Sequence, residues 1–167
     1  RDLYHVRGRE EALLNDQMRQ RYDVLADEMQ RPFDGIPAWL QMLKDEGATL
    51  IVCSVRHPYN SAPLLEKMGL LSYFDDVWGN NEGAGRDTKA KVLRYELAKA
   101  GIEPRQAVMT GDKDFDCMAA KANGLFMLGC AYGFGSIPEL HRYKADLIIS
   151  SPKQGQQVTR ILRRQEH

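Results

Sequence analysis

The chain has 167 residues, of which 43% are hydrophobic and 28% charged, and its 23 basic and 23 acidic side chains give a formal net charge of zero. This length and composition fit one globular domain with a sizeable core and a small appendage. The balanced charge and the lack of a basic stripe exclude a typical nucleic-acid-binding protein. No apolar run approaches the roughly 20 residues that span a bilayer, so no membrane partner is expected.

The three cysteines, Cys53, Cys117 and Cys130, lack CxxC spacing and lie in apolar surroundings. We therefore expect buried free thiols, not a disulfide framework or a zinc site. No signal peptide is visible, and free thiols suit a reducing compartment, so we expect a cytoplasmic protein. The sequence does not indicate an oligomeric state.

The segment 1–30 is polar and free of proline, and from Glu10 onward its apolar residues recur at helical spacing. This predicts one or two amphipathic helices that end at Arg31-Pro32. Beyond them, strand-like and helix-like segments alternate, which predicts an α/β domain with a mostly parallel sheet. Strands are expected over 49–53, 73–79, 107–109, 125–130 and 145–149, and helices over 36–45, 60–68, 88–100, 114–122, 137–141 and 158–164.

The most informative stretch is 106–124. An apolar strand, 107–109, runs into a tight turn that carries three carboxylates, Asp112, Asp114 and Asp116. Strands of a parallel sheet deliver such residues into the ligand crevice at their carboxyl ends, and three close acids repel one another unless a cation lies among them. Because Mg²⁺ takes one or two protein carboxylates, we favour Asp112 and Asp116 as its ligands. Capping of the following helix is the alternative explanation.

Two other segments offer polar groups near the same edge of the sheet. Ser54 follows the strand 49–53, where its hydroxyl can donate to an anion, and Arg56 comes close behind. Capping of the next helix explains Ser54 about equally well. Lys89 begins a helix directly after a loop, where a cation opposes the helix dipole. We therefore expect a counter-charge near Lys89, whose ammonium could reach the acidic turn.

Three features, in chain order, resemble motifs II, III and IV of the haloacid dehalogenase superfamily. They are Ser54 after one strand, Lys89 at a helix start, and the turn GDKDFD (111–116) after another strand. The phosphoglycolate phosphatase-like branch of that superfamily is resembled in particular, over about 18–149. The phrases that carry this likeness are FDGIPAWLQMLKDEGATLIVCS, TKAKVLRYELAKAGI, AVMTGDKDFDCMAAKANG and YGFGS.

The resemblance implies a three-layer, Rossmann-like parallel sheet with helices on both faces. It also implies a Mg²⁺-dependent phosphatase of a small phosphorylated metabolite, acting through an aspartyl-phosphate. In this family Ser54 would hydrogen-bond the phosphate, and Lys89 would hold both phosphate and nucleophile. Asp112 would bind Mg²⁺, and Asp116 would bind it directly or through water. Arg56 is a further candidate for substrate binding.

The chain departs from the family pattern at its beginning. Motif I, DxDGT/SLxD, which carries the nucleophile, is absent, and no Asp in 1–30 follows an apolar strand. Segment 1–31 instead resembles late helices of the family's helical cap, and 32–167 resembles the core domain without its first strand. In the family that strand lies between the strands ending at Ser54 and Asp112. We therefore expect it upstream in the parent protein, and expect this chain alone to be inactive.

Other functions fit the sequence less well. A catalytically inactive binding or assembly protein of the same fold is the alternative, since the nucleophile is not in this chain. A phospho-acceptor signalling domain would place its paired acids early in the chain. Dehalogenation in this superfamily needs no Mg²⁺. The acidic turn, which suits a metal ion, therefore argues against dehalogenation. The sequence does not select among phosphoglycolate, a nucleoside monophosphate or a sugar phosphate.

Overall fold

The computed structural model describes residues 13–14, 17, 21, 30–56 and 58–163. The chain divides into two compact units, Arg1–Pro32 and Phe33–His167, and the description below concerns the second. The segment 1–31, expected to be part of a helical cap, lies almost entirely outside the described residues. No helix in the described ranges is long and apolar enough to cross a bilayer.

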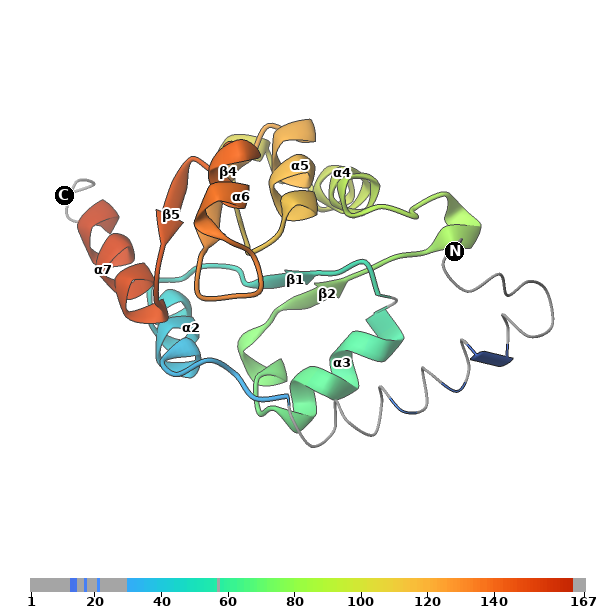
Figure 1. The fold of residues 1–167 in the computed structure, drawn as a ribbon, viewed down its shortest axis with the longest axis horizontal. Coiled ribbons are helices and arrows are strands. Elements are labelled where there is room, and N and C mark those ends of the chain that lie inside the picture. Colours follow the sequence, from blue (N-terminus) through green and yellow to red (C-terminus); the bar gives the residue numbers. More distant parts are fainter. Residues whose placement is uncertain (1–12, 15–16, 18–20, 22–29, 57, 164–167) are drawn as a thin grey trace. The chain divides into compact units, whose positions relative to one another are not determined.

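Strands and helices alternate through the second unit, as the sequence predicts (Figure 1). Its strands are β1 (Ile51–Cys53), β2 (Asp76–Trp78), β3 (Val108–Gly111), β4 (Phe126–Cys130) and β5 (Leu147–Ile149). Its helices are α2 (Ile36–Asp45), α3 (Pro58–Lys67), α4 (Lys89–Ala100), α5 (Asp114–Ala122), α6 (Ile137–Arg142) and α7 (Pro152–Arg163). Short 3-10 turns cover Leu71–Tyr73, Glu82–Ala84 and Pro104–Gln106.

Two elements differ clearly from the sequence prediction. The segment 73–79 contains only the short strand β2, because the 3-10 turn Leu71–Tyr73 occupies its start. Helix α7 begins at Pro152 and not at 158. Its start is fixed by the Ser151 hydroxyl, which accepts the N–H of Gln154 (3.2 Å), and by a proline suited to the first helical turn. The polar first turns of α7 carry no apolar periodicity that would reveal them.

The described strands form two parallel sheets. In one, β1 pairs with β2, and Cys53 lies opposite Trp78. In the other, β4 pairs with β3 on one side and β5 on the other, and Gly111 lies opposite Gly129. The parallel arrangement is the predicted one. Among the described strands, β1 and β3 each have one edge that is not hydrogen-bonded to another strand.

Helices cover both faces of the β3-β4-β5 sheet. On one face, Met109 and Met127 pack against α4, α5 and α6 through the buried side chains Val92, Leu93, Leu97, Cys117, Ala119, Ala120 and Leu140. On the other face, Leu128 and Ile149 pack against Trp39 of α2. This is the three-layer architecture that the resemblance to the family implies.

The β1-β2 sheet shares the first of these cores. Trp78 is a buried member of that core, and Ile51 and Cys53 pack against it. All three cysteines are free thiols, as expected. Cys117 and Cys130 are also buried as expected, whereas Cys53 is only half-buried. The two sheets are therefore parts of one hydrophobic core, although no strand pairing joins them in the described chain.

Candidate active site

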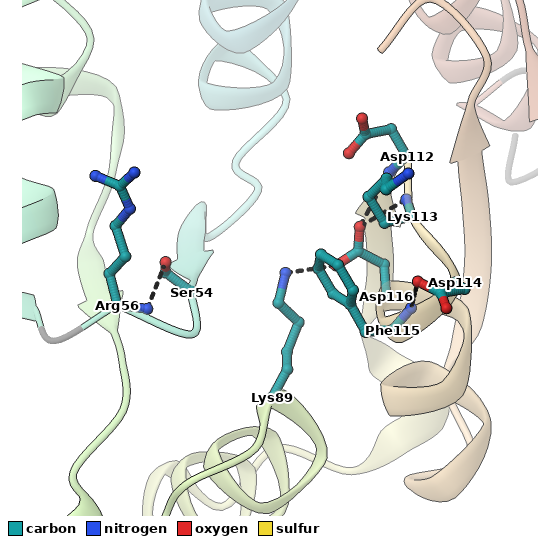
Figure 2. A network of polar contacts seen from close by, with 8 residues as sticks. All are labelled: Ser54, Arg56, Lys89, Asp112, Lys113, Asp114, Phe115 and Asp116. Carbon is teal, nitrogen blue, oxygen red and sulfur yellow. Dashed lines mark hydrogen bonds and ion pairs between the residues drawn. The ribbon is translucent and has the colours of Figure 1, made fainter. Parts of the chain in front are cut away.

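The polar residues singled out in the sequence follow strands or begin helices at one end of this core. Ser54 follows β1, and Asp112 follows β3. Lys89 is the first residue of α4. Figure 2 shows the Lys89 side chain extending between Ser54 on one side and the turn 112–116 on the other.

Lys89 and Asp116 form a buried ion pair. The Lys89 ammonium donates to Oδ1 of Asp116, and the two side chains are only 12% and 4% exposed. Oδ2 of the same carboxylate accepts the backbone N–H groups of Asp112 and Lys113, each at 3.0 Å. The counter-charge expected near Lys89 is therefore confirmed, and Asp116 joins α4 to the start of α5.

The backbone at the end of β3 is shaped for this carboxylate. Lys113 is the N-cap of α5, and Asp116 is the third helical residue, whose side chain reaches back to the exposed amides. A Cβ atom on Gly111 would lie 2.4 Å from the Asp116 carboxylate, so only glycine leaves room for it. Asp114 accepts the neighbouring N–H of Phe115 (2.8 Å). Asp114 and Asp116 thus accept backbone N–H groups at the start of α5, which is part of the helix capping that the sequence offers as the alternative explanation.

Asp112 has a different set of partners. Its Oδ2 accepts the backbone N–H of Phe134 at 2.5 Å, in the turn that follows β4. The adjacent Lys113 forms an ion pair with Glu139 of α6 (3.5 Å), which also ties the β3 turn to the segment after β4. Asp112 is half-buried.

Ser54 lies four residues before the start of α3, and the hydrogen bonds described for it are not to that helix. The N–H of Ser54 donates to the carbonyl of Trp78 (2.9 Å), and its Oγ accepts the N–H of Arg56 (3.0 Å). Since that Oγ already accepts a hydrogen bond, its own hydrogen is suited to donating to an anion. The guanidinium of Arg56 lies on the far side of Ser54 from Lys89 (Figure 2). The structure thus brings Ser54 toward Lys89 but not the Arg56 side chain.

The charge environment of Cys53 supports this arrangement. Burial raises the pKa of the Cys53 thiol to about 11, with Lys89 lowering it and Asp116 raising it by smaller amounts. The thiol at the end of β1 is therefore within electrostatic reach of the ion pair. Cys53 at the end of β1 and Ala90 in the first turn of α4 both pack against the core that contains Met109 of β3, so these segments lie in one region.

The donor chemistry of this region fits the Mg²⁺ ion that the resemblance implies. The described residues contain no group of three or more His, Cys, Asp or Glu side chains able to hold a metal ion. Mg²⁺ needs only one or two carboxylates, with water and phosphate completing its shell. Asp112 offers a carboxylate that is not paired with Lys89. Both oxygens of Asp116 already have partners, so its direct coordination stays a prediction, as does that of Asp112.

One feature of this region was missed from the sequence. The sequence predicts no function for the turn 132–136 (YGFGS), yet this turn contacts Asp112. A Cβ atom on Gly133 would lie 2.4 Å from Asp112 Oδ2, and one on Gly135 would lie 1.6 Å from the Asp112 carbonyl oxygen. The alternation of glycines is the one signal in the sequence that a close backbone approach was needed there.

Comparison with known proteins identifies the family. Residues 3–130 match the sequence profile of the haloacid dehalogenase-like hydrolases, and the chain belongs to that family. It is 32% identical over 119 residues to a phosphoglycolate phosphatase of Agrobacterium fabrum, covering 71% of this chain and 51% of the relative. It is 29% identical over 126 residues to a 5'-nucleotidase of Pseudomonas aeruginosa, covering 75% and 57%. The chain thus spans about half the length of these curated relatives.

Solved structures share the fold. "A predicted phosphatase from Clostridium acetobutylicum" is 35% identical, with a TM-score of 0.72 over 78% of this chain and 60% of that chain. A crystal structure from Clostridium difficile reaches a TM-score of 0.83 over 94% of this chain and 74% of that chain, at 20% identity. The second likeness concerns the fold alone. Together these findings confirm the fold class and the resemblance drawn from the sequence.

Proposed function

We propose that the protein containing this chain is a Mg²⁺-dependent phosphatase that hydrolyses a small phosphorylated metabolite. The observation that carries this proposal is the buried pair of Lys89 and Asp116, set beside Asp112 where β3 gives way to α5. Burying a lysine has a large desolvation cost unless it is paired. A member of this family that served only as a scaffold would have little need for a buried ion pair beside a second carboxylate.

Lys89 and Ser54 would bind the phosphoryl group. An ammonium has three donors, and one of them is directed at Asp116. The other two donors would neutralise negative charge on the phosphoryl oxygens. This neutralisation matters more as the transition state forms. The Ser54 hydroxyl would donate to another phosphoryl oxygen. Asp116 fixes the position of Lys89, so that the ammonium loses no further freedom when the substrate binds.

Asp112 is the principal metal ligand in this proposal, with Asp116 beside it directly or through water. When bound, Mg²⁺ would stabilise negative charge on the transferring phosphoryl group. The protein's part is to hold the Asp112 carboxylate in place next to Lys89. The readiness of Mg²⁺ to keep several water ligands agrees with a site that has few carboxylates.

The nucleophile would be an aspartate on a strand that this chain does not include, and it would form the aspartyl-phosphate. The break between β1 and β3 supports this part of the proposal. Both strands pack on one core, yet each keeps an edge unpaired with any described strand. Val108 and Thr110 of β3 are exposed and β1 is half-buried. A strand inserted there would form hydrogen bonds with these edges, each contributing about 0.5–1.5 kcal/mol. A native upstream sequence with no Asp after an apolar strand would contradict this.

The substrate is proposed only as a class. One relative is named for phosphoglycolate and another for 5'-nucleotides, and both are small phosphomonoesters. The full-length protein should be assayed with p-nitrophenyl phosphate, with and without Mg²⁺. Turnover that needs Mg²⁺ and stops with EDTA supports the proposal. A folded full-length protein with no turnover under either condition would instead favour the inactive binding protein.

A further inference from the structure

We propose that the turn 132–136 is a positioning device that holds the Asp112 carboxylate in the orientation needed to bind Mg²⁺. This inference rests on the proposed function, because it assigns the turn a part in the metal site. It goes further by naming residues from a different strand connection, the one that follows β4. Three contacts between this turn and Asp112 carry it.

The first two contacts are made by glycines. The Asp112 side chain lies against the Cα of Gly133, where a Cβ atom would be 2.4 Å from Oδ2 and 2.5 Å from the Asp112 Cβ. At Gly135 a Cβ atom would be 1.6 Å from the Asp112 carbonyl oxygen. Real Cβ contacts are longer than either distance, so any other residue at these positions would displace the side chain or the backbone of Asp112.

The third contact is a hydrogen bond. The N–H of Phe134 donates to Oδ2 of Asp112 at 2.5 Å, while Phe134 as a whole residue is 90% exposed. The contact uses the backbone alone, so the identity of the side chain at 134 is not what matters. A carboxylate has about four acceptor positions, and one donor leaves capacity for a metal ion. A fixed donor behind a metal ligand typically limits its rotation.

The turn is held in place at both ends. The N–H of Gly133 donates to the carbonyl of Cys130 at the end of β4 (3.2 Å). Ser136 caps α6 by accepting the N–H of Glu139 (3.2 Å), and Glu139 in turn pairs with Lys113, the neighbour of Asp112. The Phe134 amide is therefore mounted on anchored backbone, which is what orienting a carboxylate requires.

The direct test is Mg²⁺ binding by the full-length protein, measured by isothermal titration calorimetry so that the readout does not depend on turnover. Gly133→Ala should raise the Mg²⁺ dissociation constant by about 10-fold to 100-fold, because the added Cβ atom displaces Asp112 from the Phe134 N–H, and losing the group behind a metal ligand usually has an effect of this size. Gly83→Ala is the matched control. Its Cβ atom would meet only Asn81 Oδ1 at an ordinary 3.7 Å, and Mg²⁺ binding should be unchanged.

A second pair of variants keeps the test decisive if Gly133→Ala fails to fold. Phe134→Pro removes the N–H, whereas Phe134→Ala keeps it and removes only the exposed ring. The proline variant should bind Mg²⁺ at least fivefold more weakly than the alanine variant. Equal affinities in these two, or wild-type affinity in a folded Gly133→Ala protein, would overturn the inference.

The outcomes separate this inference from the proposed function. Weaker Mg²⁺ binding in the variants of a protein that hydrolyses no phosphomonoester would support the positioning role and contradict the phosphatase. Mg²⁺-dependent hydrolysis with unchanged Mg²⁺ affinity in the variants would support the phosphatase and contradict the positioning role. A wild-type protein that binds no Mg²⁺ would overturn both.

Discussion

The carboxylate of Asp116 bonds on one oxygen to the ammonium of Lys89 and on the other to the backbone amides of Asp112 and Lys113. This one side chain thereby links helix α4, helix α5 and the end of strand β3. The acidic turn needs a cation to relieve its own repulsion, and Lys89 supplies part of that charge. A metal ion would then have to balance mainly Asp112.

Asp116→Ala should lower the free energy of unfolding by about 3–5 kcal/mol, because it leaves the Lys89 ammonium buried without its partner. Urea denaturation of the full-length protein measures this loss. Asp87→Asn is the control, since it breaks an exposed pair between Asp87 and Lys91 and should cause no measurable change. An Asp116→Ala protein as stable as the wild type would show that the pair is not buried in solution.

Lys89→Met should reduce kcat by about 100-fold to 1,000-fold, the usual effect of removing a donor that stabilises transition-state charge. The apolar stem is kept, but the buried Asp116 carboxylate loses its cation, so the variant should be less stable than the wild type. Its kcat is therefore measured on protein whose folding is checked by circular dichroism. Lys91→Met, two residues further along the same helix and exposed, should keep wild-type turnover. Similar kcat values for the two variants would remove Lys89 from the proposed mechanism.

Ser54→Ala should lower kcat/KM by about 10-fold to 100-fold, because a hydrogen bond to a charged group contributes about 1.5–3 kcal/mol. The fold should not change, since the hydrogen bond described for the Ser54 hydroxyl is a local one, from the Arg56 amide. Ser72→Ala, in the exposed part of a 3-10 turn, serves as the comparison. If steady-state kinetics give the same kcat/KM for both, Ser54 does not contact the phosphate.

The pKa values of two thiols, the half-buried Cys53 and the buried Cys130, predict how the free energy of unfolding changes at alkaline pH. Burial raises the pKa of Cys53 and of Cys130 from 9.0 to about 11. In the unfolded chain these thiols ionise near pH 9, whereas the native protein keeps their protons until about pH 11. Their contribution is therefore complete below pH 9 and is lost as the pH rises through 9 to 11. A shift of this size corresponds to about 2–3 kcal/mol for each thiol.

Urea unfolding at pH 8 and at pH 10.5 measures that loss. A Cys53→Ala, Cys130→Ala double variant should lose less stability than the wild type between these two values. Equal losses would mean that other groups cause the alkaline destabilisation.

The sequence predicts most of the fold because the signals are local. The α/β order follows from local patterns and needs no information about distant contacts. These patterns are the apolar strands before Ser54 and Asp112 and the periodic helix after Lys89. The partner of Lys89 could also be anticipated, because a cation at a helix start opposes the dipole. Apolar spacing predicts the start of helix α7 too late in the chain, because that start depends on a serine cap and a proline.

The side-chain partners within the candidate site do not follow from local sequence patterns. That Asp116 pairs with Lys89 while Asp112 contacts Phe134 depends on which loops meet at the sheet edge. The contribution of Phe134 is a backbone N–H, which every residue except proline carries, so its side chain gives no hint of it. Only the flanking glycines marked the close approach.

The central claim is that Asp112 holds the metal ion on which phosphate hydrolysis depends. The most direct measurement is the Mg²⁺ dependence of p-nitrophenyl phosphate turnover by the full-length protein and by its Asp112→Asn variant, with folding checked by circular dichroism. We expect a folded variant whose turnover at saturating Mg²⁺ is reduced by about 100-fold or more. A folded Asp112→Asn protein with wild-type turnover and wild-type Mg²⁺ dependence would contradict the account.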